Sequence, residues 1–244
     1  MDMVPEVAQL LLFQGMEKTE LSELLAAAKI HRVHKGEYLF RHGEDIRKFY
    51  VITNGAIRKF RETPDGKEIT LKLALRGDVV GASHIFESCS GYQWSAVAAE
   101  DTALLEFSIL GFKEAARKHH GLTLNLLTSM SQNAHMAAID AEHLVTFSAA
   151  QRIACFLLRL CILYDFDPAG FELPYSKTTI ASRLGMELET FSRSLQTLKK
   201  NGVDIQGSHA SIQNLRQLEC FVCGHCSIEG ECSTRRALDK YTDT

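Results

Sequence analysis

The chain has 244 residues, of which 45% are hydrophobic and 23% charged, and its formal net charge is -3. These values predict a soluble globular protein with room for two domains, and they exclude a global basic field that would attract nucleic acid. No run approaches the roughly 18 apolar residues that a membrane span needs, and residues 1–13 lack the basic start of a signal peptide, so a cytoplasmic protein is expected.

The first predicted elements are helical, and a β-rich region follows them. Leucines recur at helix-like spacing over residues 5–29, with Gly15 as a break. From residue 30 to 108, short β-rich runs alternate with turn signals, which predicts an antiparallel barrel or sandwich. Pro64-Asp65-Gly66 predicts a hairpin turn. The expected strands cover residues 30–33, 37–40, 49–53, 56–61, 68–75, 96–99 and 103–108.

A long helix is predicted over residues 112–145, starting after Gly111. One narrow seam on it has apolar residues at a spacing of three and four, which is typical of pairing with an identical helix and predicts a homodimer. The alternative is a helix that is buried within its own domain. The seam consists of Leu127, Met130, Ala134, Ala137, Ala141 and Leu144.

The second half of the chain begins near Thr146, where a capping box at residues 148–151 starts another helix. Cys155 and Cys161 lie in this apolar helix and are expected to be inert core residues.

A helix-turn-helix is predicted next. Ser176 can cap a short helix over residues 177–184, and a second helix runs from about residue 188 to 201, with Gly185 in the turn between them. Residues 203–212 then form a small hairpin, which would be the wing of a winged helix-turn-helix.

Four of the seven cysteines fall within residues 220–232, with the spacing C-x2-C-x2-C-x5-C. Thiolates packed this closely repel one another unless a metal neutralises them, so a cofactor is predicted. The favoured cofactor is an iron–sulfur cluster of the 4Fe–4S type, and the alternatives are zinc or several free thiols. The candidate ligands are Cys220, Cys223, Cys226 and Cys232.

The glycine-marked stretches at residues 35–44, 49–55 and 77–81 resemble the barrel signatures of the CRP/FNR family of bacterial transcription regulators. The resemblance covers nearly the whole chain and implies an α+β protein that is not an enzyme. The implied parts are a cyclic-nucleotide-binding-type β-roll with N-terminal helices (1–111), a dimerisation helix (112–146), a winged helix-turn-helix (147–219) and a cysteine-rich tail (220–244). The implied partners are double-stranded DNA, RNA polymerase and a second copy of the chain.

The resemblance also predicts that cyclic nucleotides are not bound. Family members that bind them carry a Glu and an Arg-Ser pair at positions that match Ser83 (Ala82 with a one-residue shift) and Trp94-Ser95 here. Their adenine-contacting hydroxyls match Ala137 and Ala138. A cyclic phosphate buried without its cation would be costly.

The second helix of the helix-turn-helix matches the E-x-x-S-R pattern of the FNR branch at Glu189, Ser192 and Arg193, which share one helix face. The resemblance implies an FNR-box-like palindrome, in which Glu189 and Arg193 read the C·G and G·C pairs of a TTGAT-like half-site and Ser192 lies near a thymine. The alternative is that these three side chains only form a solvent-exposed helix face and have no role in reading DNA. Candidates for phosphate contacts are Thr190, Ser176, Lys177, Thr179 and Lys199.

Residues 223–232 have the C-x2-C-x5-C spacing of FNR, which carries it near its N-terminus. Some family members have a C-terminal three-cysteine site that an Asp near the end of the long helix completes, and Asp140 lies in that neighbourhood here. The fourth ligand is open between Cys220 and Asp140, with Cys220 favoured because it is close in sequence. His225 is a candidate hydrogen-bond donor to a sulfur.

The implied function is a regulator that senses oxygen, nitric oxide or redox state through this cluster. One alternative is the same kind of regulator with a structural zinc tail and a small-molecule or haem effector. A second alternative is that the chain is not a regulator but an iron–sulfur protein that transfers electrons.

Overall fold

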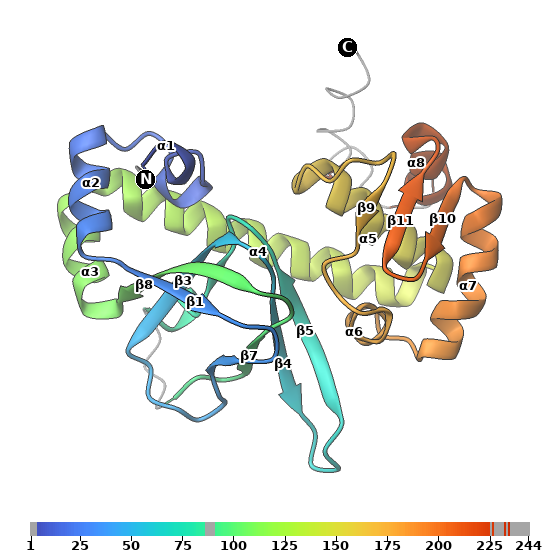
Figure 1. Cartoon of the computed structure of the whole chain (residues 1–244), viewed down its shortest axis with the longest axis horizontal. Helices are drawn as coiled ribbons and strands as arrows, with labels where there is room; N and C mark the ends of the chain where they lie inside the picture. Colours follow the sequence, from blue (N-terminus) through green and yellow to red (C-terminus); the bar gives the residue numbers. More distant parts are fainter. Residues whose placement is uncertain (1–3, 86–90, 225, 227–231, 233, 235–244) are drawn as a thin grey trace. The chain divides into compact units, whose positions relative to one another are not determined.

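The computed structural model describes residues 4–85, 91–224, 226, 232 and 234 (Figure 1). The chain divides into two compact units, residues 1–138 and 139–244, and the division falls within the long helix α4 (His120–Thr146). Among the described residues, no helix combines the length and the apolar character that crossing a membrane requires.

The first unit contains two four-stranded antiparallel sheets, with strand orders β1-β8-β3-β6 and β2-β7-β4-β5. The seven predicted strands are all present, and the two-residue strand β6 was not predicted. The strands are β1 (Lys29–Val33), β2 (Tyr38–Phe40), β3 (Lys48–Asn54), β4 (Ile57–Glu62), β5 (Glu68–Ala74), β6 (Val79–Val80), β7 (Ser95–Ala98) and β8 (Thr102–Ser108).

The predicted hairpin turn joins β4 to β5, which form the long ribbon labelled in Figure 1. The backbone N–H of Thr63 donates to the carbonyl oxygen of Lys67 at 2.9 Å, and Gly66 has a φ of +79°. That left-handed backbone is the conformation that glycine adopts at low cost, so the sequence signal and the turn agree.

The helices that come before and after the β-roll in the sequence pack on its core. Phe49 of β3 stacks on Phe107 of β8 with ring centroids 5.3 Å apart, and Phe112 of α3 (Ile109–Lys118) meets Phe49 edge-on at 4.7 Å. The N-terminal elements are α1 (Val4–Val7), η1 (Leu11–Phe13) and α2 (Lys18–Ala26). The predicted helical region therefore forms three short pieces, and its last residue, Lys29, belongs to β1.

The prediction of one helix over residues 112–145 is wrong at its start. Ser108 caps α3, since its hydroxyl oxygen accepts from the N–H of Gly111 at 3.5 Å, so the helix begins before that glycine. His119 then takes an extended conformation, with φ -116° and ψ 93°, and separates α3 from α4. Its Nδ1 lies 3.0 Å from Glu20 Oε1 of α2, a contact 99 residues away that no local pattern predicts.

The described part of the second unit contains the expected helix that starts after Ser148, the expected winged helix-turn-helix and, after the wing, a helix that was not predicted. Its elements are α5 (Ala149–Leu163), β9 (Phe171–Glu172), α6 (Lys177–Arg183), α7 (Leu188–Lys200), β10 (Val203–Gln206), β11 (His209–Ile212) and α8 (Leu215–Cys223). The strands form a sheet in the order β10-β11-β9, and α5 packs against both α7 and α8. Asn214 caps α8 by accepting from the N–H of Gln217 at 3.0 Å. The α+β architecture is thus confirmed.

Candidate DNA-binding surface and cysteine site

The helix-turn-helix consists of α6 and α7. Ser176 begins α6, because its hydroxyl oxygen accepts from the N–H of Thr179 at 3.1 Å. In the turn that follows α6, Gly185 has a φ of +63°, and a Cβ on it would also meet Leu144 Cδ2 at 2.7 Å. The left-handed backbone favours glycine here and sets the direction in which α7 leaves the turn.

The helix α7 has one buried face and one exposed face. Phe191 and Leu198 are buried and attach the helix to the core of the second unit. Glu189, Ser192 and Arg193 are exposed, as their spacing along the helix predicts. The three candidate base-reading residues therefore lie together on a solvent-facing surface.

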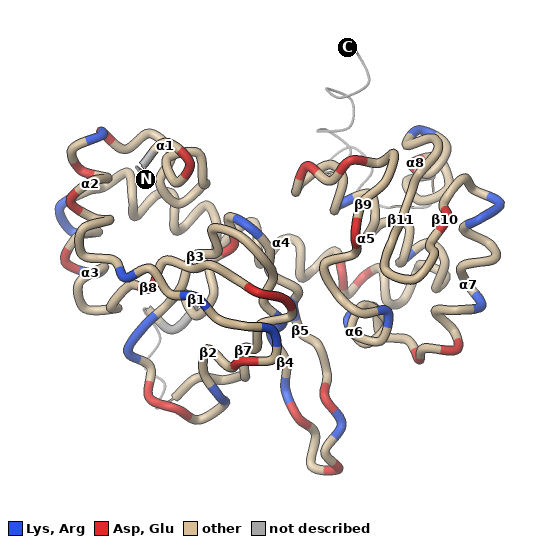
Figure 2. Tube along the Cα trace, in the orientation of Figure 1, with Lys and Arg blue, Asp and Glu red and all other residues tan. Residues whose placement is uncertain are grey.

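The candidate phosphate contacts lie around this surface. Ser176 and Thr179 have hydroxyl oxygens 2.9 Å apart at the start of α6, where Lys177 is half-buried. Thr190 is half-buried on α7, and Lys199 is exposed, with Nζ 4.0 Å from Asp204 Oδ1. Figure 2 shows acidic positions at the start of α7 and basic positions farther along it.

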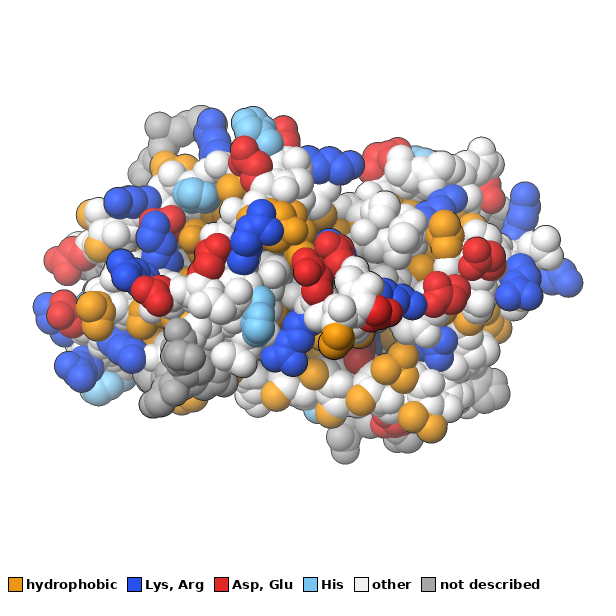
Figure 3. Space-filling view, turned by 90° about the horizontal axis from the view of Figure 1, so that it is seen from below, with side chains coloured by type: hydrophobic (Ala, Val, Ile, Leu, Met, Phe, Trp, Pro, Cys, Tyr) orange, Lys and Arg blue, Asp and Glu red, His pale blue; other side chains and the backbone are white. Residues whose placement is uncertain are grey.

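The exposed surface carries both signs of charge. On the face drawn in Figure 3, basic and acidic side chains are interspersed with hydrophobic ones. This agrees with the formal net charge of -3 and means that DNA attraction must come from a local set of residues.

The cysteines of the tail differ in their surroundings. Cys220 is exposed, Cys223 and Cys226 are half-buried, and Cys232 is buried. Helix α8, which carries Cys220 and Cys223, is attached to α5 by Gln151, whose Nε2 donates to the carbonyl oxygen of Phe221 at 3.3 Å. The end of α8 is therefore fixed against α5.

A fifth cysteine lies beside this tail. Cys155 is one helical turn beyond Gln151 on α5 and is buried, as predicted, but it is not surrounded by apolar core alone. After burial and the opposing charge of Arg159, the charges of Cys232 and Cys226 raise the pKa of Cys155, and the charges of Cys155, Cys232 and Cys226 raise that of Cys223. Sequence reasoning missed Cys155 because 68 residues separate it from Cys223.

Burial keeps two of these thiols protonated. It raises the pKa of Cys155 to about 11 and that of Cys223 to about 12, and the neighbouring thiols add to both shifts. Cys161, whose pKa burial also raises to about 12, belongs to the same helix. Thiols in this state bind a metal only with release of their protons.

Asp140 is held by two arginines. Its Oδ1 accepts from Arg159 Nη1 of α5 at 2.5 Å, and its Oδ2 accepts from Arg183 Nη2 of α6. Burial would raise the pKa of this carboxyl, but the two guanidinium groups hold it below its ordinary value. Both carboxylate oxygens are thus used in ion pairs that join α4, α5 and α6.

His143 contacts the tail, which the sequence did not predict. Its Nε2 lies 3.6 Å from Cys226 Sγ, and its ring stacks on Phe147 with centroids 3.9 Å apart. Burial, followed by the charge of Arg159, lowers the pKa of His143 and favours the neutral imidazole. The predicted donor His225 lies outside the described residues.

The chemistry of this region fits a thiolate-bound group. Among the described residues, no three His, Cys, Asp or Glu side chains are already arranged to hold a metal ion. However, Arg159 Nε and Thr234 Oγ1 are buried and have no hydrogen-bond partner within the described part of the chain. The charge of Arg159 acts on the pKa of Cys155, and Thr234 is two residues beyond Cys232 in the sequence. Soft thiolate donors with nearby N–H and O–H groups suit an iron–sulfur cluster or zinc.

Two family models match the chain, each over one of its units. The cyclic nucleotide-binding domain matches residues 30–119, and the Crp-like helix-turn-helix domain matches residues 151–221. The chain belongs to the CRP/FNR family of transcription regulators. It is therefore a DNA-binding regulator.

Relatives and solved structures agree with this family. The fumarate and nitrate reduction regulatory protein of Vibrio cholerae is 27% identical over 87% of this chain and 86% of its own length. The anaerobic regulatory protein of Bacillus subtilis is 27% identical over 86% of this chain and 92% of its own length. The structure of FixK2 from Bradyrhizobium japonicum has a TM-score of 0.71 at 24% identity and covers 80% of this chain and 97% of that chain, which shows the shared fold.

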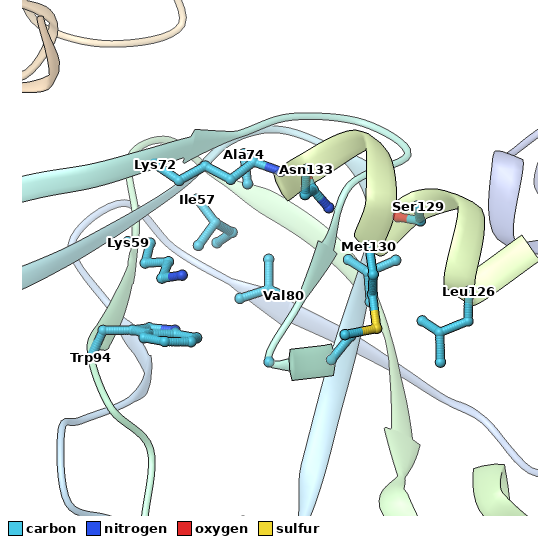
Figure 4. Close-up of a pocket in the computed structure, with 13 residues that line it drawn as sticks. Ile57, Lys59, Lys72, Ala74, Val80, Trp94, Leu126, Ser129, Met130 and Asn133 are labelled. Atoms are coloured by element: carbon cyan, nitrogen blue, oxygen red, sulfur yellow. Dashed lines mark hydrogen bonds between the residues drawn. The ribbon is translucent and has the colours of Figure 1, made fainter. Parts of the chain in front are cut away.

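The β-roll of this family member contains a small pocket of about 160 Å³ (Figure 4). Lys59 Nζ lies 3.2 Å from the centre of the Trp94 ring, and Lys72 Nζ donates to Asp78 Oδ1 at 2.8 Å and to Asn133 Oδ1 at 2.6 Å. Both lysines thus already interact with protein groups. The side chain of Ser83 lies outside the described part of the chain, and the exclusion of cyclic nucleotides stays a prediction.

Proposed function

We propose that the chain is a cytoplasmic homodimer that binds FNR-box-like palindromes under the control of an iron–sulfur cluster at its C-terminal cysteines. The cluster would respond to oxygen, nitric oxide or redox state. The observation that carries this proposal is that helix α8, which carries Cys223 of the C-x2-C-x5-C motif, packs on α5, and that α5 also packs on the recognition helix α7 in the same unit.

DNA reading would take place on the exposed face of α7. Glu189 can accept a hydrogen bond from a cytosine amino group, and Arg193 can donate two to a guanine. Ser192 lies between them on the same exposed face. Thr190, Ser176, Lys177, Thr179 and Lys199 would contact phosphates and fix the register of the helix. RNA polymerase is the proposed partner at the promoter.

Dimerisation would use the seam of α4. Five of its six residues are exposed in the single chain, and Met130 is half-buried. Leu127 and Leu144 are 53% and 50% exposed, so both present apolar surface that a partner helix could cover. A second copy of the same helix would cover this seam, and the small alanines would permit close approach.

The protein's own contacts suggest how the cysteine site reaches the recognition helix. Helix α8 packs on α5, and α5 packs on α7. A thiolate-bound cluster supplies a reactive, negatively charged crosslink between segments of the chain. Attaching the tail to α5 would restrict α5 and α7 to one arrangement, and release of the tail would shift the population away from the DNA-competent form.

The fourth ligand was predicted to be Cys220 or Asp140, and the surroundings favour neither of them. Cys220 is exposed on α8, and both oxygens of Asp140 accept from arginines. Cys223, Cys226 and Cys232 remain the proposed ligands from the motif.

The test of this function is a determination of iron, sulfide, zinc and haem in anaerobically purified full-length protein, together with a visible spectrum. Iron and sulfide in equal amounts with a brown chromophore would support the proposal. Stoichiometric zinc without iron would contradict it and favour a structural zinc tail, and bound haem would favour the haem-sensor alternative.

A further inference from the structure

We infer that Lys72 of β5 positions helix α4 on the β-roll by bonding to Asn133, and so fixes the side on which α4 presents the proposed dimer seam. This inference rests on the proposed dimerisation through α4 and assigns a residue outside the seam that controls it. Lys72 and its partners all belong to the first unit.

Lys72 connects the β-roll to α4. Its Nζ donates to Asp78 Oδ1, in the turn between β5 and β6, at 2.8 Å and to Asn133 Oδ1 of α4 at 2.6 Å. Figure 4 shows the side chain of Lys72 extending toward Asn133. The side chains of Lys72 and Asp78 are only 29% and 14% exposed, so solvent and salt weaken this ion pair less than one on the open surface.

Asp78 is itself held in place by the turn that carries it. Its Oδ2 accepts from the backbone N–H of Leu75 at 2.9 Å, and its own N–H donates to the carbonyl oxygen of Leu75 at 2.9 Å. Gly77 between them has a φ of +89°, a left-handed backbone that glycine adopts at low cost. The carboxylate therefore holds the ammonium group of Lys72 at a defined place on the β-roll, and Asn133 bonds to that group.

The position of Lys72 in the sheet would be unfavourable without these partners. Lys72 lies directly opposite Lys59 in the ladder between β4 and β5, and like charges at opposite positions of two strands repel each other. Lys59 Nζ lies 3.2 Å from the centre of the Trp94 ring, whereas Lys72 bonds to Asp78 and Asn133. Each ammonium group is thus compensated by a different set of atoms, and that of Lys72 is directed to α4.

Asn133 lies where α4 leaves the core of the β-roll. Leu122 and Leu126 are buried in that core and attach the first turns of the helix. Asn133 follows Leu126 by seven residues, which places it on the same helix face. Four of the five residues that come after it in the first unit are exposed, namely Ala134, His135, Ala137 and Ala138. Apolar packing therefore fixes the start of α4, and the bond to Lys72 fixes it at the point where exposed residues begin.

The proposed dimer seam runs beside this bond. The seam residues Met130 and Ala134 lie three residues before and one residue after Asn133. By holding Asn133, Lys72 sets the rotation of α4 about its axis at this level and with it the direction in which Ala134 and Ala137 point. Without the bond, α4 could turn or lift from the β-roll. Two copies would then lose the close, regular packing that paired helices need.

The experiment measures the dimer dissociation constant of the anaerobically purified full chain by sedimentation equilibrium. Lys72→Met and Asn133→Leu each remove one side of the bond. Each is expected to raise the dissociation constant by about tenfold or more, which is the scale of one hydrogen bond to a charged group. The double variant should dimerise no more weakly than Lys72→Met, since both single variants lose the same bond.

Two matched controls accompany these variants. Asn133→Asp keeps an acceptor for Lys72 and should dimerise like the wild-type chain. Lys18→Met removes one positive charge at an exposed position of α2 and should also leave the dissociation constant unchanged. Unchanged dissociation constants in both Lys72→Met and Asn133→Leu would overturn the inference, and so would losses that simply add in the double variant.

A second measurement follows the attachment of α4 without relying on the dimer. Trp94 is the single tryptophan of the chain and lines a pocket that α4 also lines. Acrylamide should quench its fluorescence more strongly in Lys72→Met and Asn133→Leu than in the wild-type chain or Asn133→Asp, because α4 no longer closes its side of the pocket. Unchanged quenching would overturn the inference. Stronger quenching supports the role of Lys72 even in a chain that sediments as a monomer, a result that would contradict only the proposed dimerisation.

Discussion

Arg183, in the first helix of the helix-turn-helix, donates a hydrogen bond to the carboxylate of Asp140, near the end of α4. The same carboxylate accepts from Arg159 of α5 at 2.5 Å. One acidic side chain therefore joins three helices of the DNA-binding unit. This ties the part of α4 that carries the last residues of the proposed dimer seam, Ala141 and Leu144, to the helix that precedes the recognition helix.

The first prediction follows from this pair of contacts. Asp140→Asn leaves two largely buried arginines without their counter-charge, so the free energy of unfolding of the second unit should fall by about 1–3 kcal/mol. This loss of stability is smaller than the loss expected for a fully buried ion pair, because the carboxylate of Asp140 is about one-fifth exposed. Urea denaturation of the metal-free protein measures it. Asp204→Asn, which removes an exposed contact to Lys199, should change stability by less than about 0.5 kcal/mol.

The second prediction concerns sequence reading by α7. Arg193→Ala should weaken binding to a TTGAT-containing palindrome by about 1–3 kcal/mol and relax selectivity at one guanine. Lys199→Ala should instead weaken binding to all sequences alike and reduce the salt dependence by about one charge. Fluorescence anisotropy on specific and random duplexes at several salt concentrations separates the two. Equal losses for Arg193→Ala on both duplexes would show that this residue only contacts phosphate.

The third prediction concerns the seam of α4. Ala137 is exposed at its middle, and Ala137→Glu would bring two like charges together at a close crossing of paired helices. The variant should sediment as a monomer where the wild-type chain sediments as a dimer. Gln132→Glu adds the same charge at an exposed position away from the seam and should leave the dimer intact. A complete dimer with Ala137→Glu would rule out this seam.

The fourth prediction concerns Cys226, whose sulfur lies next to His143. Cys226→Ser should lose the anaerobic chromophore and weaken specific DNA binding, while the β-roll stays folded because it belongs to the other unit. On one preparation, the visible spectrum tests the loss of the chromophore, a binding titration tests the specific DNA affinity, and thermal unfolding tests whether the β-roll stays folded. Retention of the full chromophore would exclude Cys226 as a ligand.

The sequence predicts this fold wherever the signal is local. Turn glycines such as Gly66 and caps such as Ser176 determine the structure of the residues next to them, so the strands and the helix-turn-helix could be located. His119, at the break between α3 and α4, contacts Glu20 of α2, and Asp140 of α4 is paired with arginines of two other helices. Such contacts arise only when the whole chain packs, and no periodicity or spacing encodes them.

We propose above that a cluster at the cysteine tail controls specific DNA binding. Its most direct test follows iron content and affinity for an FNR-box-like palindrome in the same anaerobic sample while air is admitted. We expect specific affinity to fall in step with the loss of iron, while weak binding to random DNA remains. Specific affinity that stays unchanged after all iron has left the protein would contradict it.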